Sequence, residues 1–287
     1  MYNLIRIEFK KAFTNKLFTI ALIIGTVIAV LCAIYNIQAM ELEKQYYQRT
    51  LEISGKGQNP NLQAFGLYNH WICQDFSSML SALYFMLFPI LSAVAYGWSF
   101  FAERKSGYIK NVITRGKKLE YYLAKYIAAF AAGGTVVTIP VVINFIVVAC
   151  FLPALKPYIF FDIYYGVNSP SMFSELFYEQ PLLYSFIRML LVFLYGGGAA
   201  AISFALAFVV PNRIGVLLLP FLMCLGLQYA RANIVPQSFM PELSPIYIIG
   251  SHGVHIRVLW TVLLEAAIAI AVTLALCLYK GMREDVM

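Results

Sequence analysis

The stretch LFTIALIIGTVIAVLCAIYNIQAM, residues 17–40, runs between Lys16 and Glu41 without a charged side chain. A helix needs about 20 apolar residues to cross the hydrocarbon core of a membrane, so these 24 residues are long enough. Their apolar side chains run on continuously and do not alternate with polar ones, which disfavours a membrane β-barrel. The stretch therefore predicts a membrane-spanning helix.

Similar charge-poor stretches recur along the chain and predict six spans in all. We place them at about residues 17–37, 79–101, 126–151, 186–210, 214–230 and 258–279. The composition agrees, because 61% of residues are hydrophobic and only 12% are charged, against about 25% charged in soluble domains. We expect an all-α membrane protein that forms a single transmembrane domain over residues 1–287.

The charges predict the orientation of these spans. If both termini lie inside, the inner segments hold 14 of the 21 Lys and Arg residues and 5 of the 14 acids. Inner loops of membrane proteins are enriched in Lys and Arg. We therefore expect both termini in the cytoplasm and a location in the cell membrane. This explains the net charge of +7 without a nucleic-acid partner, for which the sequence has no base-reading pattern.

Two segments outside the spans have a recognisable pattern. Residues 2–16 place apolar side chains at helical spacing, which favours a helix lying in the inner membrane interface; a plain basic flank is the alternative. Residues 231–257 hold Pro236, Pro241 and Pro245 among apolar residues and are too short for two spans. They predict a re-entrant-like outer loop before the last helix.

The inner loop at residues 103–118 is the most informative segment. Six of its sixteen residues are basic, and Ile109, Val112 and Ile113 form an apolar stripe at helical spacing. Gly107 and Gly116 bracket this stripe as stop signals. An inner loop without a docking function would be rich in basic residues but would not carry this apolar stripe. We therefore expect a short surface helix that docks on a partner.

With these features the chain resembles the permeases of ABC-2 type transporters, the membrane subunits of ATP-driven exporters. The resemblance rests on Leu4-Ile5-Arg6-Ile7-Glu8-Phe9-Lys10-Lys11 before the first span and on Glu103-Arg104-x-x-Gly107 after the second. The six spans with a re-entrant-like loop before the last complete it. The resemblance covers the whole chain, and the arrangement is more specific than any single motif.

The resemblance implies a permease that works with a cytoplasmic ABC ATP-binding subunit and a second permease chain, identical or related. It makes the loop after the second span the coupling helix, with Glu103 and Arg104 as polar contacts and Gly107 as the turn. The other implied coupling residues are Ile109, Lys110, Val112, Ile113 and Arg115. The implied function is export of a substrate such as a peptide antibiotic, or immunity to it.

Motifs for chemistry on the chain itself are missing from the sequence. It has no G-x-x-x-x-G-K-[ST] phosphate loop, so energy is expected from a separate chain or an ion gradient. We expect no catalytic residue, no cofactor and no metal, although His252 and His255 have a spacing that suits a metal on a helix. A disulfide between Cys73 and Cys150 is left open.

Polar groups within spans are costly and are candidates for function. Arg188 and Glu265 lie at similar depths near the outer side, and we expect them to form an intramembrane pair. The alternative is separate snorkelling of Arg188 and a hydrogen-bonded Glu265. Small residues at 196–201, with Gly133 and Gly134, predict close helix packing.

Three other functions remain open. A gradient-driven secondary transporter or channel would use charges near the membrane midplane, where the sequence offers only the off-centre Glu265. An intramembrane enzyme would need a catalytic constellation, and none is visible. A sensor or immunity protein that binds a peptide without transport shares the sequence features of the permease.

Overall fold

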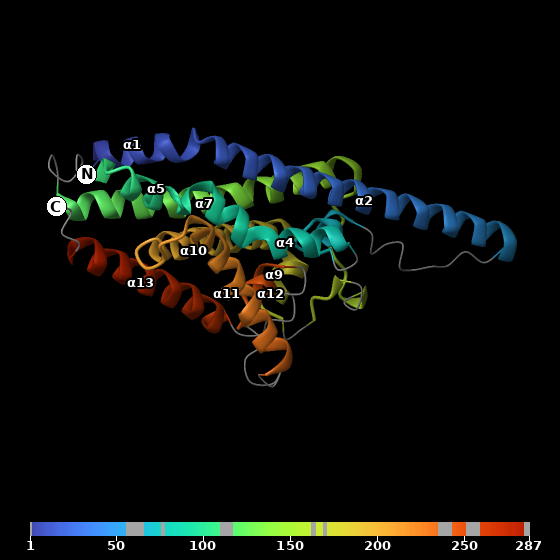
Figure 1. The fold of residues 1–287 in the computed structure, drawn as a ribbon. Coiled ribbons are helices and arrows are strands. Elements are labelled where there is room, and N and C mark those ends of the chain that lie inside the picture. The colour runs from blue at the N-terminus through green and yellow to red at the C-terminus, as the bar shows by residue number, and fades with distance from the viewer. Residues whose placement is uncertain are drawn as a thin grey trace.

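The computed structural model describes residues 2–55, 66–75, 78–109, 117–161, 165–168, 171–234, 243–250 and 259–283, and these residues form helices and connections without a strand. The helices, in chain order, are α1 Tyr2–Phe13, α2 Lys16–Ser54, α3 Leu67–His70, α4 Met79–Ser92, the π-helix η2 Ala93–Gly97, α5 Ser99–Lys105, α7 Lys118–Phe151, the 3-10 helix η3 Ile159–Phe161, α9 Ser174–Glu179, α10 Pro181–Leu206, α11 Arg213–Asn233, α12 Pro245–Ile249 and α13 Leu259–Arg283. Figure 1 shows them as an elongated bundle.

Among the described residues, six helices are long and apolar enough to cross a membrane. They are α2, the continuous unit Met79–Lys105 formed by α4, η2 and α5, and then α7, α10, α11 and α13. Each predicted span overlaps one of these helices, and their number among the described residues is as predicted. The chain is consistent with a multi-pass membrane protein.

The first of these helices is much longer than predicted. α2 has 39 residues, about 58 Å at the usual rise, whereas the hydrocarbon core is only ~30 Å thick. Its second half extends beyond the other helices (Figure 1) and ends where Gly55 adopts a left-handed φ of 61° and donates its N–H to the Leu51 carbonyl. Residues 38–54, which lie beyond the span predicted at about residues 17–37, therefore continue the helix.

α7 is the central helix of the bundle. It packs against α1, α2, α4, η2, α10 and α13, and its contact with α10 is especially close because both helices carry glycine there. A Cβ on Gly133 would overlap the Ala200 side chain, and one on Gly196 would overlap Val137. The small residues thus permit close packing, as predicted from the sequence.

This packing predicts opposite effects for the same substitution on two glycines. Gly133→Ala forces α7 and α10 apart and should destabilise the protein by about 1–3 kcal/mol, as overpacking does. Gly198→Ala places its Cβ where no atom lies within 4 Å, and it should be neutral or slightly stabilising because alanine favours a helix. Thermal unfolding of the two variants in one detergent measures this. An equal midpoint for both would contradict the close contact.

The start of α1 and the end of α13 lie at one end of the bundle (Figure 1). Figure 1 places α1, α5 and the C-terminal end of α13 there, and the second half of α2 at the other end. This arrangement gathers α1, α5 and the first turns of α7 into one region.

Candidate functional site

The predicted coupling segment begins with the end of α5 and a turn. Arg104 and Lys105 are exposed, and the chain then turns at Gly107, whose φ of 72° is in the left-handed region that favours glycine. The turn expected at Gly107 is therefore present. Lys110, Val112, Ile113 and Arg115 lie outside the described residues.

Ile109 corrects the expected docking surface. We predicted that its side chain would contact a partner, but it is only 4% exposed and belongs to the main hydrophobic core. After the turn at Gly107 the chain directs this apolar side chain inward, where it is removed from water. Ile109 therefore anchors the segment, and the exposed groups beside it are Arg104, Lys105 and Tyr108.

Glu103 also points inward, toward charged groups of other helices. Its carboxylate accepts hydrogen bonds from Lys125 Nζ at 2.7 Å, Tyr121 Oη at 2.6 Å and Lys11 Nζ at 3.2 Å. Its side chain is 17% exposed. Glu103 was expected to contact a partner chain, but its described contacts are internal.

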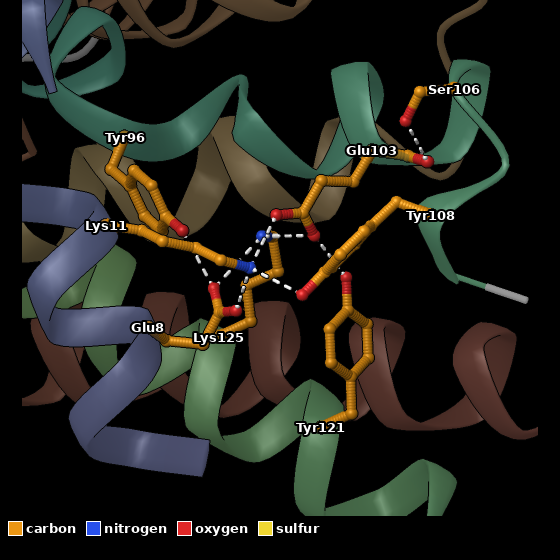
Figure 2. Close-up of polar contacts among 8 residues, drawn as sticks. All are labelled: Glu8, Lys11, Tyr96, Glu103, Ser106, Tyr108, Tyr121 and Lys125. Atoms are coloured by element: carbon orange, nitrogen blue, oxygen red, sulfur yellow. Dashed lines mark hydrogen bonds and ion pairs between the residues drawn. The ribbon is translucent and has the colours of Figure 1, made fainter. Parts of the chain in front are cut away.

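These contacts belong to a four-charge cluster, which we define as Glu8, Lys11, Glu103 and Lys125 (Figure 2). Glu8 lies on α1 and is 2.8 Å from Lys11 Nζ and 3.1 Å from Lys125 Nζ. Lys125 bridges the two carboxylates and its side chain is fully buried. The cluster therefore joins α1, α5 and α7, which are far apart in the sequence.

Tyrosines complete the hydrogen bonding of the four-charge cluster. Tyr96 donates its hydroxyl to Glu8 at 2.7 Å, and it lies in the π-helix η2, an irregularity that often marks functional sites. Tyr108, just after the turn, receives a hydrogen bond from Lys11 at 3.2 Å and lies under its ammonium group. The segment after the second span is thus tied to the N-terminal helix.

Contacts within the cluster shift the pKa values of Glu8 and Lys11. Burial raises the pKa of the Glu8 carboxyl, but the charge of Lys125 and hydrogen bonds from Lys11 and Tyr96 outweigh it and lower that pKa. Burial lowers the pKa of Lys11, whereas its hydrogen bond to Glu8 and the charge of Glu103 raise it, and the net shift is upward. The contacts within the cluster therefore favour the charged forms of Glu8 and Lys11.

The predicted pair of Arg188 and Glu265 is not formed in the described structure. Arg188 is 2% exposed and donates to the carbonyls of Ile248, Ile249 and Gly250 at 2.9, 3.2 and 2.7 Å. The end of α12 presents these carbonyls and carries partial negative charge, which attracts the guanidinium. Glu265 accepts a hydrogen bond from Tyr195 Oη at 3.0 Å instead.

Arg188 thereby fixes the one described helix of the predicted re-entrant-like loop. Ile248 and Ile249 of α12 are buried, and buried carbonyls need a hydrogen-bond partner, which the Arg188 guanidinium supplies to Ile248, Ile249 and Gly250. The two candidate polar groups therefore have separate roles: Arg188 holds α12, and Glu265 lies beside Tyr195.

Two other expectations concern cysteine and metal. All five cysteines are free, with Cys73 buried and Cys150 exposed, so the disulfide left open between them is not formed. In the part of the chain that the structure describes, no three His, Cys, Asp or Glu residues gather in a group that holds a metal. His252 and His255 fall outside that part.

In the part of the chain that the structure describes, the protein is all-helical, with six helices able to cross a membrane. A partly buried four-charge cluster lies at the end of the bundle where α1 starts and α13 ends. No protein-family model matches the chain, and no curated protein matches it.

Proposed function

We propose that the chain is the membrane-spanning permease subunit of an ABC-2 type exporter. In this proposal it moves a substrate, such as a peptide antibiotic or another amphipathic compound, using ATP hydrolysed by a separate cytoplasmic subunit. The observation that carries the proposal is the four-charge cluster, because it joins the N-terminal helix to the segment after the second span. That segment is where the resemblance places the coupling helix.

The cluster suggests how movement passes into the membrane part. Closure of an ATPase pair would push on the segment after α5, and Glu103 would transmit the push to Lys125 at the start of α7 and to Glu8 and Lys11 on α1. Since α7 is the central helix, displacing it shifts its packing partners α2, α10 and α13 as well. The spans would then alternate between inward- and outward-open arrangements.

The proposal also sets the surroundings of the chain. It places the chain in the cell membrane with both termini in the cytoplasm, α1 in the inner interface among lipid headgroups, and α12 near the outer face. A second permease chain, identical or related, completes the transport path. The basic residues at the end where α1 and α5 lie support this orientation.

Exposed basic residues beside the turn provide the test of ATPase docking. We expect the double variant Arg104→Glu with Lys105→Glu to retain the fold. The amount of ATP-binding subunit that co-purifies with it should fall about tenfold or more, because a partner surface complementary to basic residues repels acidic ones. The measurement is quantitative mass spectrometry of the complex purified after expression with the neighbouring genes.

A matched double reversal supplies the control. Lys44→Glu with Arg49→Glu changes the same charge on the exposed second half of α2, at the opposite end of the bundle. It should leave the recovered ATP-binding subunit unchanged. Equal recovery with both double variants would contradict docking at Arg104 and Lys105.

Glu265 favours one alternative, a gradient-driven secondary transporter or channel. Its carboxylate lies within α13, and an ionisable group inside a span is a candidate for an ion or proton path. Transport by reconstituted chain in vesicles with an ion gradient and no nucleotide would support this alternative. Transport that requires the ATP-binding subunit and ATP would exclude it.

A further inference from the structure

A cavity opens between α10, α11 and α13, away from the four-charge cluster. It has a volume of about 390 Å³, within the range of about 300–1,000 Å³ that small-molecule sites occupy. Its walls are almost wholly apolar and include Phe88, Leu194, Leu227 and Leu276. Such walls suit a hydrophobic ligand.

Glu265 is the one acid among the residues that line this cavity. Its described polar contact is the hydrogen bond from Tyr195, whose hydroxyl also lies 3.1 Å from the carbonyl of Val262. Among the described residues, the ion pairs involve Glu8 and Glu103 but not Glu265. A carboxylate in apolar surroundings is stabilised strongly by a cation that comes into contact with it.

We infer that this cavity binds a hydrophobic cation, with the positive charge against Glu265 and the apolar body between α10, α11 and α13. The carboxylate of Glu265 favours a positively charged ligand, and the apolar walls favour a ligand whose remaining surface is hydrophobic. Exposed side chains of Met223, Ile268 and Val272 form part of the lining, so the cavity opens on the outer surface of the bundle. A ligand dissolved in the membrane therefore has direct access.

The absence of a side chain at Gly198 leaves room for a ligand in the cavity. Gly198 lines the cavity, and a Cβ built on it meets no atom within 4 Å, in contrast to Gly196 and Gly197 in the same turn, which are packed against Val137 and Phe130. The face of α10 that carries Gly198 is therefore left open. The binding site stands on this geometry, and the view that its ligand is the transported substrate rests on the proposed function.

Binding is tested with tetraphenylphosphonium, a hydrophobic cation, and tetraphenylborate, an anion of the same shape. The full chain, with any subunit that co-purifies, is placed in nanodiscs of phosphatidylcholine, and equilibrium binding is measured against empty nanodiscs. We expect saturable binding of the cation, weak binding of the anion, and a loss of about tenfold or more in cation affinity for Glu265→Gln, as removal of a charge-assisted contact implies. Equal binding of the two ions, or no effect of Glu265→Gln, overturns the inference.

A pair of leucine substitutions locates the site. Gly198→Leu fills the cavity and should abolish cation binding, whereas Gly226→Leu, on the exposed side of α11 where a Cβ also meets nothing within 4 Å, should leave it intact. If neither or both substitutions abolish binding, the cation binds elsewhere and the inference is wrong. A lipid acyl chain in the cavity would be displaced by Gly198→Leu but would be insensitive to Glu265→Gln.

The binding measurement uses no nucleotide and does not depend on an ATPase. Suppose that Glu265→Gln and Gly198→Leu weaken cation binding as expected, but the chain recruits no ATP-binding subunit. This result would support the site and contradict the proposed exporter. Recruitment of the subunit without cation binding would contradict the site and leave the exporter standing.

Discussion

Lys125→Met is expected to destabilise the protein more than any other single substitution in the four-charge cluster. The ammonium group is fully buried and bridges Glu8 and Glu103, so its removal leaves two carboxylates sharing Lys11. Breaking a buried ion pair in this way costs about 3–5 kcal/mol, which corresponds to a fall in the thermal midpoint on the order of 10 °C. Tryptophan fluorescence during heating in a fixed detergent measures it.

Two further variants separate charge imbalance from loss of packing. Glu8→Gln combined with Lys125→Met leaves Lys11 and Glu103 as a balanced pair, and it should recover most of the lost stability, as coupled neighbours do in a double-mutant cycle. Lys44→Met makes the same change at an exposed position on α2 and should have almost no effect. If the double variant is as unstable as the sum of its single changes, the cluster is not the coupled unit described above.

Arg188→Met is expected to release α12 from the bundle. The guanidinium donates to three consecutive carbonyls, of Ile248, Ile249 and Gly250, in a buried setting. Arg188→Met removes this charged donor from all three carbonyls, and the combined loss should be about 3–5 kcal/mol. A cysteine placed at Ile249 in a background without other cysteines should be protected in the parent and become reactive to a membrane-impermeant maleimide in Arg188→Met.

Arg231→Met provides the matched control for Arg188→Met. Arg231 stacks on the ring of Tyr247 at 3.3 Å from its centroid and so also contacts α12, but through a cation–π contact worth about 0.5–1 kcal/mol. It should leave the cysteine at position 249 protected. Equal reactivity in both variants would show that Arg188 has no special part in holding α12.

The spans could be predicted from sequence because the cost of burying charge in a membrane acts on each segment separately. That rule predicted the six helices. It could not predict where α2 ends, because the helix continues to Ser54 through polar and charged residues. The sequence between Glu41 and Glu52 is compatible with a helix, yet nothing in it distinguishes one continuous helix from a separate one.

The site was harder to predict because it depends on which way each helix faces. Arg188 and Glu265 share a depth, but the first is directed toward α12 and the second toward Tyr195. Ile109 fits an exposed stripe in sequence and lies in the core in three dimensions. Glu8 gave one usable signal, because it is four residues from both Leu4 and Ala12 and so lies on the apolar face of α1. Its partner Lys125 gave no such signal, because a basic residue at the edge of a predicted span is common and does not indicate burial.

The proposal that this chain is a permease driven by a separate ATPase is tested most directly by purification in mild detergent after expression with its neighbouring genes, followed by mass spectrometry. The account predicts an ATP-binding subunit at equal stoichiometry with the chain. A pure chain without such a subunit, from a membrane in which ATP-binding subunits are present, would contradict it and make Glu265 the first residue to test for ion coupling.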